Sequence, residues 1–448
     1  MIDDLETKGK LRFILDKNFV FTHKSISQQI KEAIRGGPKL LFKKIVKLLD
    51  LIFFNLYVII TFLIITPFII LISPIVIVRI GLLESNALGH FSRCVEIYLA
   101  EEKLGFHKIS KPTIDLWFLQ KNISNKFLFK KWKGYFLILP RILLFPLYLI
   151  YSKIKFLYKF TTPMRYGGVK FNPRTKHFNM HNDIYNALNS VKPLITFSNS
   201  EKRFCENQLA ILGIHPEKKI ITLHVRDDKY WKDKKNPQSA DINTYIKTIK
   251  YLIDNGFQVV RMGKGPTNQI NFTGKYFIDY SNSKLRSDIL DIYLIYKSYL
   301  HVGTQSGFNV LPSLFRKPYI QTNVYLDIAA EYGNEDYLFI PKKIKEVNRN
   351  KFINLKYIKK NYSHLKLLSE TIYENPNLEI IDNTENEILA VVKEKTSKLN
   401  GTWKEEMNLK FMQEIYKKIN TSLFEDIRLK GNIGHDFLLN NPYLIDQE

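Results

Sequence analysis

Cysteine is almost absent from this sequence, which has 448 residues and only two thiols, Cys94 and Cys205. Two cysteines cannot supply the several bridges that hold a small secreted domain together, so a disulfide-dependent fold is excluded. A zinc site built from Cys-x-x-Cys pairs is excluded as well. The low cysteine content fits a reducing compartment.

Acidic residues are outnumbered, because 43 Asp and Glu stand against 67 Lys and Arg, which gives a formal net charge of +24 at pH 7. This excess favours an anionic partner: a membrane surface, a nucleic acid or a phosphorylated substrate. The zinc-finger, RNP and basic-zipper patterns do not occur in the sequence, so no nucleic-acid partner is expected.

The length fits two or three domains, at roughly 100–200 residues per domain. Apolar residues make up 45% of the chain and aromatic residues 13%. This composition excludes a wholly disordered protein and allows a sizeable core. No internal repeat is visible.

One uncharged run stands out: the 28 residues Leu51–Val78 contain no charged side chain. About 20 apolar residues suffice to cross the roughly 30 Å hydrocarbon core of a bilayer. Pro67 and Pro74 interrupt the run, so we expect residues 51–73 to enter a membrane and the β-branched Ile75–Ile80 to form a buried strand. The run begins too late and is too long for a cleaved signal peptide.

Basic residues precede this run and predict that its N-terminal side is cytoplasmic. They are Lys31, Arg35, Lys39, Lys43, Lys44 and Lys47, against Glu32. The part that follows the run is basic too. A re-entrant segment that returns to the same face would therefore place the main domain at the cytoplasmic face of a bacterial inner membrane. A single span and a buried core helix stay open as alternatives.

Residues 126–160 alternate basic clusters with apolar stretches. Trp132, Tyr148 and Tyr151 accompany the lysines, a mixture that suits a segment lying in the interface of an anionic membrane. An ordinary domain helix with one apolar face is the equally open alternative.

Strands and helices alternate in the second half of the chain. Strands are expected at 220–225, 257–261, 276–280, 299–302 and 319–322, and helices at 201–212, 242–255, 288–296 and 308–315. This alternation predicts a parallel, doubly wound α/β sheet over residues 218–340. Residues 384–419 are expected to be helical.

The first candidate site lies at the carboxyl end of the expected strand at 220–225. It consists of His224, Arg226, Asp227 and Tyr230, because ligands of open α/β sheets bind beyond the carboxyl ends of the strands. A guanidinium at this place can hold a phosphate through two parallel hydrogen bonds. A structural ion pair of Arg226 with a nearby aspartate is the alternative.

The second candidate site is the sequence Gly303-Thr304-Gln305-Ser306-Gly307, which follows the strand at 299–302 and opens the expected helix at 308–315. Glycines allow close approach of the backbone to a ligand, and a helix N-terminus attracts phosphate. The alternative is a capped strand-to-helix turn with Ser306 as the N-cap.

Further polar candidates are weaker. Ser287 and Asp288 precede a helix, where Asp288 would contact a ribose or cap the helix. In the first domain, His90 opens a helix and Glu84 precedes it, and either side chain is a candidate general base. A structural role is the alternative for both.

Taken together, four segments resemble a bacterial family of surface-polysaccharide glycosyltransferases that often occur beside tetratricopeptide repeats. The segments are HVRDDKYW, ADINTYIKTIKYLIDNGFQVVRMG, IDYSNSKLRSDILDIYL and HVGTQSGFNVLPSLFRKPYIQTN, and the resemblance covers roughly Ile75–Glu101 and Ser200–Ile445. It implies a GT-B-like fold with two Rossmann-like lobes, in which the C-terminal lobe holds a nucleotide-diphosphate sugar.

The resemblance also implies site roles. Arg226 would bind the diphosphate with support from His224. Four residues fall on the family motif G-T-x-S-G, namely Gly303, Thr304, Ser306 and Gly307. Arg261 and Gly263 fall on its R-M-G motif. One departure matters: the family tends to carry Arg-Asn where this chain has Gln238-Ser239. If that arginine contacts donor or acceptor, this chain uses a different sugar or is impaired.

The expected organisation has four parts. Residues 1–74 form a basic N-terminal region and membrane-inserted segment, and 75–215 an acceptor lobe with the interfacial insertion 126–160. Residues 216–380 form the nucleotide-sugar lobe, and 381–448 are helices that pack back on the lobes.

The sequence therefore predicts a glycosyltransferase that moves a sugar from a nucleotide-diphosphate sugar to a membrane-linked or polysaccharide acceptor. No Asp-x-Asp triplet occurs, so a metal-dependent diphosphate site of the GT-A type is not expected, and no cofactor is predicted. A membrane-anchored, non-catalytic nucleotide-sugar-binding or scaffold protein is the alternative.

Overall fold

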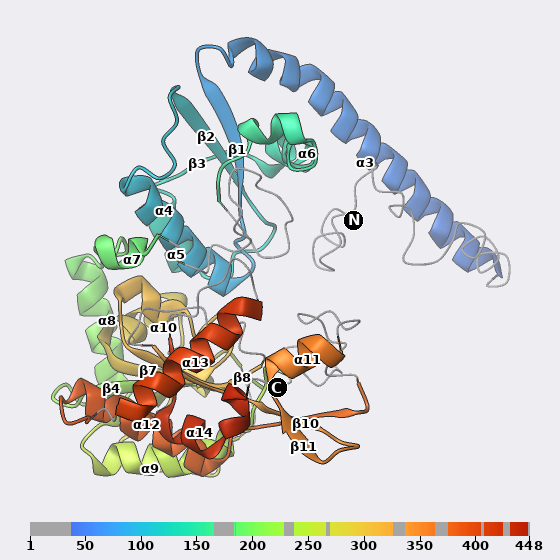
Figure 1. Cartoon of the computed structure of the whole chain (residues 1–448). Helices are drawn as coiled ribbons and strands as arrows, with labels where there is room; N and C mark the ends of the chain where they lie inside the picture. Colours follow the sequence, from blue (N-terminus) through green and yellow to red (C-terminus); the bar gives the residue numbers. More distant parts are fainter. Residues whose placement is uncertain are drawn as a thin grey trace. The chain divides into compact units, whose positions relative to one another are not determined.

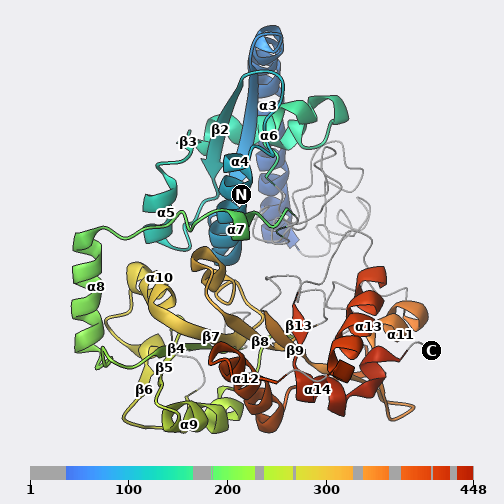
Figure 2. The ribbon, with the colours of Figure 1, turned by 60° about the vertical axis from the view of Figure 1, so that its left-hand side comes forward.

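The computed structural model describes residues 37–164, 183, 185–227, 237–265, 269–325, 337–362, 375–404, 407–423 and 431–446. They belong to two compact units (Figures 1 and 2). Unit 1 takes its residues from Met1–Asn86, His107–Ser124 and Phe129–Asn179. Unit 2 takes its residues from Ala87–Phe106, Asn125–Leu128 and Met180–Glu448.

Unit 1 is built on a small parallel sheet with the order β1-β2-β3. Its strands are β1 (Ile77–Leu83), β2 (Thr113–Leu119) and β3 (Leu137–Ile138). The helix α6 (Arg141–Tyr151) packs on β1 and β2, and the 3-10 helix η2 (Lys155–Phe160) follows it. All residues of β1 are buried, as the run of β-branched side chains predicts.

The longest helix, α3 (Gly37–Ile72), contains most of the uncharged run. The expected interruption at Pro67 is wrong, because the helix continues through this proline and ends before Pro74. A proline removes one backbone N–H and can bend a helix without ending it. The structure therefore contains one continuous helix over residues 51–72 and no reversal of the chain within it.

Unit 2 is dominated by a seven-stranded sheet in which every neighbouring pair is parallel. The order is β13-β9-β8-β7-β4-β5-β6. The strands are β4 (Ile220–His224), β5 (Gln258–Arg261), β6 (Phe277–Asp279), β7 (Ser298–Thr304), β8 (Tyr319–Val324), β9 (Leu338–Pro341) and β13 (Asn432–Ile433). The chain begins at the central β4, builds outward through β5 and β6, and returns to add β7, β8 and β9 on the other side, which is the doubly wound order of dinucleotide-binding folds.

Helices cover both faces of this sheet. Figures 1 and 2 show α9 (Ile246–Asp254), α12 (Glu385–Leu399) and α14 (His435–Asn440) on one side and α10 (Asp288–Lys297) on the other. The core between the sheet and α9 contains Ile221, Val259 and Ile249, each fully buried. The predicted α/β class with parallel sheets is therefore confirmed.

The other elements complete the two units. They are the π-helix η1 (His90–Cys94), α4 (Val95–Lys103), α5 (Lys126–Trp132), α7 (Ala187–Ser190), α8 (Asn199–Ile211), η4 (Ile242–Tyr245), η5 (Tyr280–Asn282), η6 (Leu311–Phe315), α11 (Leu355–Asn361), α13 (Met407–Leu423) and η8 (Pro442–Ile445). A second, antiparallel sheet has the order β11-β10-β12, with β10 (Lys343–Glu346), β11 (Lys351–Ile353) and β12 (Leu378–Ile381).

The expected helix at 308–315 is wrong. Residues 305–310 form bends and turns, and only the short 3-10 helix η6 follows. Pro312 near its start lacks an N–H, and the bonds run over three residues, as from Ser313 N–H to the Val310 carbonyl. The attraction of an α-helix N-terminus for phosphate is therefore not present at this loop.

Candidate functional site

The candidate site lies where the strand order of unit 2 reverses. The strands β4 and β7 are neighbours, although β5, β6 and α10 separate them along the chain. Loops that leave two such strands at their carboxyl ends diverge to opposite sides of the sheet and create a crevice there. The two motifs expected to bind a diphosphate follow these two strands.

Hydrogen bonds join the end of β4 directly to the loop after β7. His224 Nδ1 and Ser306 Oγ are 3.2 Å apart, and the backbone N–H of Arg226 donates to Thr304 Oγ1 over 2.9 Å. The strand register also pairs His224 with Gly303. The structure therefore brings both sequence motifs into one site.

Gly303 makes this close arrangement possible. A Cβ atom at this position would lie 2.4 Å from Asn309 Oδ1 and 2.6 Å from the His224 carbonyl oxygen. Both distances are shorter than van der Waals contact, so no side chain fits without moving β4 or the loop. The glycine expected to let a ligand approach in fact lets two protein segments approach each other.

The Arg226 guanidinium is half-buried and close to the position where the chain departs from the family pattern. Its Nη1 donates to Gln238 Oε1 over 2.6 Å, and its backbone carbonyl accepts from the Ala240 N–H over 2.9 Å. Gln238 is thus a contact of the proposed phosphate-binding arginine. An arginine at position 238 would bring a second guanidinium to the same place.

His224 is an uncharged part of the site at pH 7. It is stacked on Phe308 with ring centroids 4.8 Å apart. Burial, together with the positive charges of Arg226 and Arg261, lowers the pKa of His224 to about 3. The neutral ring can therefore orient Ser306 without repelling the neighbouring arginines.

A second histidine, His301, lies beneath the site. It is fully buried in β7, and its Nδ1 is 2.9 Å from Thr222 Oγ1 of β4. Burial and the nearby His224 lower the pKa of His301 to about 3, and the adjacent Asn309 side chain partly opposes the shift. This pair ties β4 to β7 just before the two strands end.

Arg286 holds the loop after β5. Gly263 has a φ of 142°, and its carbonyl accepts from Arg286 Nε over 2.7 Å. Arg286 also forms an ion pair with Asp291, whose pKa burial raises to about 6 against the opposing effect of Arg286. Arg261 is 2% exposed and pairs with Asp279 over 3.1 Å, so the structure gives it a cross-strand role.

Asp288 acts as a helix cap. Its Oδ2 accepts from the Lys126 backbone N–H over 2.7 Å, and its carbonyl accepts from Asn125 Nδ2 over 3.0 Å. It therefore caps α5 rather than its own helix α10, which supports a structural role over contact with a ribose. Ser287 occupies the N-cap position of α10, and its N–H donates to the Tyr280 hydroxyl over 3.1 Å.

His90 belongs to unit 2, not to the unit that carries β1. A Cβ atom at Gly89 would lie only 2.9 Å from Gly307 Cα, so the start of η1 touches the 303–307 loop. Burial lowers the pKa of His90 to about 4, and its Nδ1 is 3.6 Å from Cys94 Sγ. π-Helical turns often occur at functional sites.

The remaining predicted residues are dispersed. Glu84 directly follows β1 in unit 1, where burial and then its carboxylate raise the pKa of the Tyr148 phenol. Asp227 is half-buried beside Arg226. Tyr230 lies outside the described residues.

Asn309 and Arg286 are site residues that sequence reasoning missed. Asn309 is fully buried and reaches Gly303, and Arg286 joins the loop after β5 to α10. No local pattern marks them, although Arg286 stands only five residues before Asp291, the acid with which it pairs.

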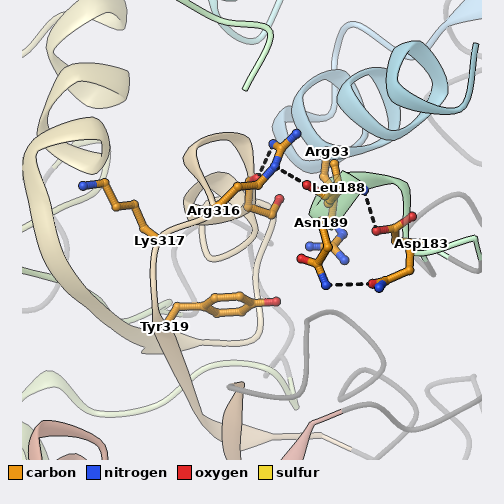
Figure 3. Close-up of a pocket in the computed structure, with 9 residues that line it drawn as sticks. Arg93, Asp183, Leu188, Asn189, Arg316, Lys317 and Tyr319 are labelled. Atoms are coloured by element: carbon orange, nitrogen blue, oxygen red, sulfur yellow. Dashed lines mark hydrogen bonds between the residues drawn. The ribbon is translucent and has the colours of Figure 1, made fainter. Parts of the chain in front are cut away.

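Unit 2 also contains a separate hollow of about 380 Å³ that is open to solvent (Figure 3). It is lined by Arg93, Asp183, Asn186, Leu188, Asn189, Ser313, Arg316, Lys317 and Tyr319. Tyr319 begins β8, so the hollow lies at the opposite end of the strands from the candidate site. Arg316 donates to the carbonyls of Leu188 and Val191 and pairs with the fully buried Glu96 over 2.9 Å, which indicates a structural clamp.

Among the described residues, no group of three or more His, Cys, Asp or Glu side chains is arranged to hold an ion. Positive charge in the candidate site instead comes from Arg226 and Arg286.

No protein-family model matches the sequence, and no curated protein matches it either. Among solved structures, the ADP-heptose heptosyltransferase II of E. coli is 15% identical, with coverage of 54% of this chain and 84% of that chain and a TM-score of 0.32. A family 9 glycosyl transferase from Veillonella parvula is 10% identical, with coverage of 66% and 91% and a TM-score of 0.36. A protein from Listeria monocytogenes described as a UDP-N-acetylglucosamine 2-epimerase is 12% identical, with coverage of 74% and 98% and a TM-score of 0.30. Likenesses this distant carry no argument about function.

Proposed function

We propose that this protein is a GT-B-type glycosyltransferase that uses a nucleotide-diphosphate sugar. The observation that carries the proposal is the direct joining of Arg226 and His224 to the 303–307 loop at the point where the strand order reverses. A crevice at this point of a doubly wound sheet is a general binding place for nucleotides. The adjacent guanidinium supplies the charge that a diphosphate needs.

The proposed reaction places the diphosphate beside Arg226. The bond from the anomeric carbon of the sugar to the phosphate oxygen breaks, and a new bond forms from that carbon to an acceptor hydroxyl oxygen. The nucleoside diphosphate leaves with the bonding electron pair, and Arg226 stabilises the negative charge that develops on it. The acceptor proton passes to a base.

His90 is the proposed base within unit 2, because its helix touches the 303–307 loop. With a pKa of about 4, it is neutral at pH 7 and able to accept a proton. This pKa is lower than the near-neutral value that favours general-base catalysis. Titration of His90 should therefore leave the rate constant for sugar transfer unchanged between pH 5 and 8. Glu84 is the second candidate for the base.

The acceptor is proposed to be a lipid-linked or surface-polysaccharide hydroxyl at the cytoplasmic face of a bacterial inner membrane. The apolar helix α3 supports a membrane location, because by length and composition it is the one helix of the described residues that could cross a bilayer. The net charge of +24 favours anionic lipid and anionic substrate alike.

A non-catalytic nucleotide-sugar-binding or scaffold protein is the second candidate. Its supporting observation is the 2.6 Å hydrogen bond from Arg226 to Gln238, at the position where the resembled family tends to carry arginine. A site with one cation fewer would hold the same diphosphate more weakly.

Binding and turnover with a panel of nucleotides separate these candidates. The detergent-solubilised chain is mixed with UDP-, GDP-, ADP-, CMP- and dTDP-sugars, and the melting temperature and hydrolysis of each sugar are measured. A transferase predicts stabilisation by one nucleotide class with slow release of its sugar to water. Stabilisation without release in the presence of candidate acceptors supports a non-catalytic nucleotide-sugar-binding protein. No stabilisation by any nucleotide contradicts the transferase and favours the scaffold.

A further inference from the structure

One face of α3 packs against the rest of unit 1. Phe54, Val58, Thr66 and Ile69 are each less than 8% exposed, although their helix carries a long apolar run. Their spacing of three, four and eight residues places them on a single side of an α-helix. The buried stripe therefore marks a specific packing face.

The packing partner is α6. The Tyr57 hydroxyl donates to the Ile142 carbonyl, and the Thr66 and Tyr151 hydroxyls are 3.0 Å apart. The rings of Phe54 and Phe145 also lie 6.3 Å apart. These contacts extend along α3 from Phe54 to Thr66, which is about 20 Å of helix.

The sheet of unit 1 lies behind α6 and contains an ion pair. Figure 1 shows α6 beside β1 and β2, on which it packs. Within these strands, Arg79 donates to both carboxylate oxygens of Asp115 over 2.6 Å. A helix crossing the hydrocarbon core upright would draw this α/β sheet into the bilayer with it, where an ion pair and strand edges are costly.

The opposite face of α3 is apolar and exposed. It includes Ile52, Phe53, Leu56, Ile60, Leu63, Ile64, Phe68 and Leu71, each between 46% and 75% exposed. Ile142 in α6 and Phe156 in η2 of the same unit are also apolar and exposed, at 67% and 68%. An exposed apolar face along more than five turns of helix requires an apolar partner.

Lysines surround this apolar face. Lys39 and Lys43 are exposed at the start of α3, and Lys111 donates to the Ser73 carbonyl just beyond its end. Lys153 and Lys155 are exposed next to Phe156. Positive charge at both ends and along the flank matches the anionic headgroups of a lipid surface.

We propose that unit 1 is a monotopic membrane-docking unit. The helix α3 lies along a single leaflet of an anionic membrane, with its exposed apolar face in the acyl region and its buried face on α6. Both ends of α3 then remain on the same side of the bilayer. This proposal does not depend on the transferase activity, because it uses only residues of unit 1.

Cysteine accessibility distinguishes this arrangement from a span. Both native cysteines are buried, so single cysteines introduced by Lys43→Cys and Lys111→Cys can be labelled with an impermeant maleimide in sealed inner-membrane vesicles of both orientations. The proposal predicts that both positions are labelled from the cytoplasmic side only. Labelling of the two positions from opposite sides would overturn it.

Vesicle binding tests whether lipid covers the exposed apolar face of α3. The full chain should bind phosphatidylglycerol-containing vesicles in flotation, and the substitution Leu63→Glu should reduce bound protein at least tenfold, because the 62% exposed Leu63 faces the lipid. Ile211→Glu is the matched control, since Ile211 is 68% exposed on α8, and it should bind like the unmodified chain. Unchanged vesicle binding of Leu63→Glu would assign the face to another partner.

Discussion

At the scale of residues, the site depends on groups that are held close together and kept uncharged. His224 and His301 are neutral because they are buried, and Gly303 has no room for a side chain. The sequence marked His224 and Gly303 because they lie at the carboxyl ends of expected strands. It could not mark His301 and Asn309, because their importance arises only when β4 and β7 become neighbours.

Replacement of Gly303 by alanine should destabilise unit 2. The new methyl group would meet Asn309 Oδ1 and the His224 carbonyl at 2.4 and 2.6 Å, and overpacking of this kind costs about 1–3 kcal/mol. Urea unfolding measures the change. Gly134→Ala serves as the control, because its methyl group would lie no closer than 3.8 Å to any neighbouring atom. Equal effects of the two substitutions would contradict the close packing.

Acid should destabilise the protein through its buried histidines. The pKa of His224 and of His301 is about 3 in the folded state and near 6.5 in an unfolded chain. The unfolded state therefore binds more protons as the pH falls below about 6.5, and the unfolding free energy decreases with falling pH. The stability that these neutral rings contribute is fully present above that pH.

The variant His301→Gln tests this dependence. It removes one titrating group while keeping a polar side chain, so its unfolding free energy should change less between pH 7 and pH 4.5 than that of the unmodified chain. Chemical denaturation at several pH values measures both slopes. Parallel curves would show that His301 does not titrate as proposed.

At the scale of elements, the sheet of unit 2 was predictable and its surroundings were not. Strands such as β4 and β5 agree with expectation within one residue at each end, because β-branched runs bounded by polar turns define them. The expected helix opening at His90 is present, but the π geometry of η1 and the 3-10 geometry of η6 were not predicted, since helix hydrogen-bond patterns depend on tertiary packing. The cap of α5 by Asp288 was equally hidden, because it joins residues far apart in sequence.

The Arg316 clamp joins α4, α7 and η6, and its loss should be severe. Arg316→Ala would leave the fully buried Glu96 carboxylate without its partner, which costs about 3–5 kcal/mol for a buried pair. The double substitution Arg316→Ala with Glu96→Gln should regain part of this stability, because it removes the buried charge. A double variant as unstable as the sum of both singles would contradict the pairing.

At the scale of the whole molecule, the chain combines a doubly wound parallel sheet in unit 2 with a long apolar helix in unit 1. Composition indicated both features, through the alternation of strands and helices and through the uncharged run. Continuity of α3 through Pro67 could not be predicted, because proline interrupts helices in some settings and only bends them in others. Which residues form each unit also depends on the fold, as His90 in unit 2 illustrates.

The central claim is that Arg226 holds the diphosphate of a nucleotide at the carboxyl ends of β4 and β7. Its most direct test is the dissociation constant of the preferred nucleoside diphosphate for the unmodified chain and for Arg226→Ala, measured by calorimetry. Arg203→Ala removes the same charge from an exposed position on α8 and is the control. A charge-assisted hydrogen bond contributes about 1.5–3 kcal/mol, so the account predicts roughly 10- to 150-fold weaker binding for Arg226→Ala and unchanged binding for Arg203→Ala. Equal affinity of Arg226→Ala and the unmodified chain, with the fold intact, would contradict it.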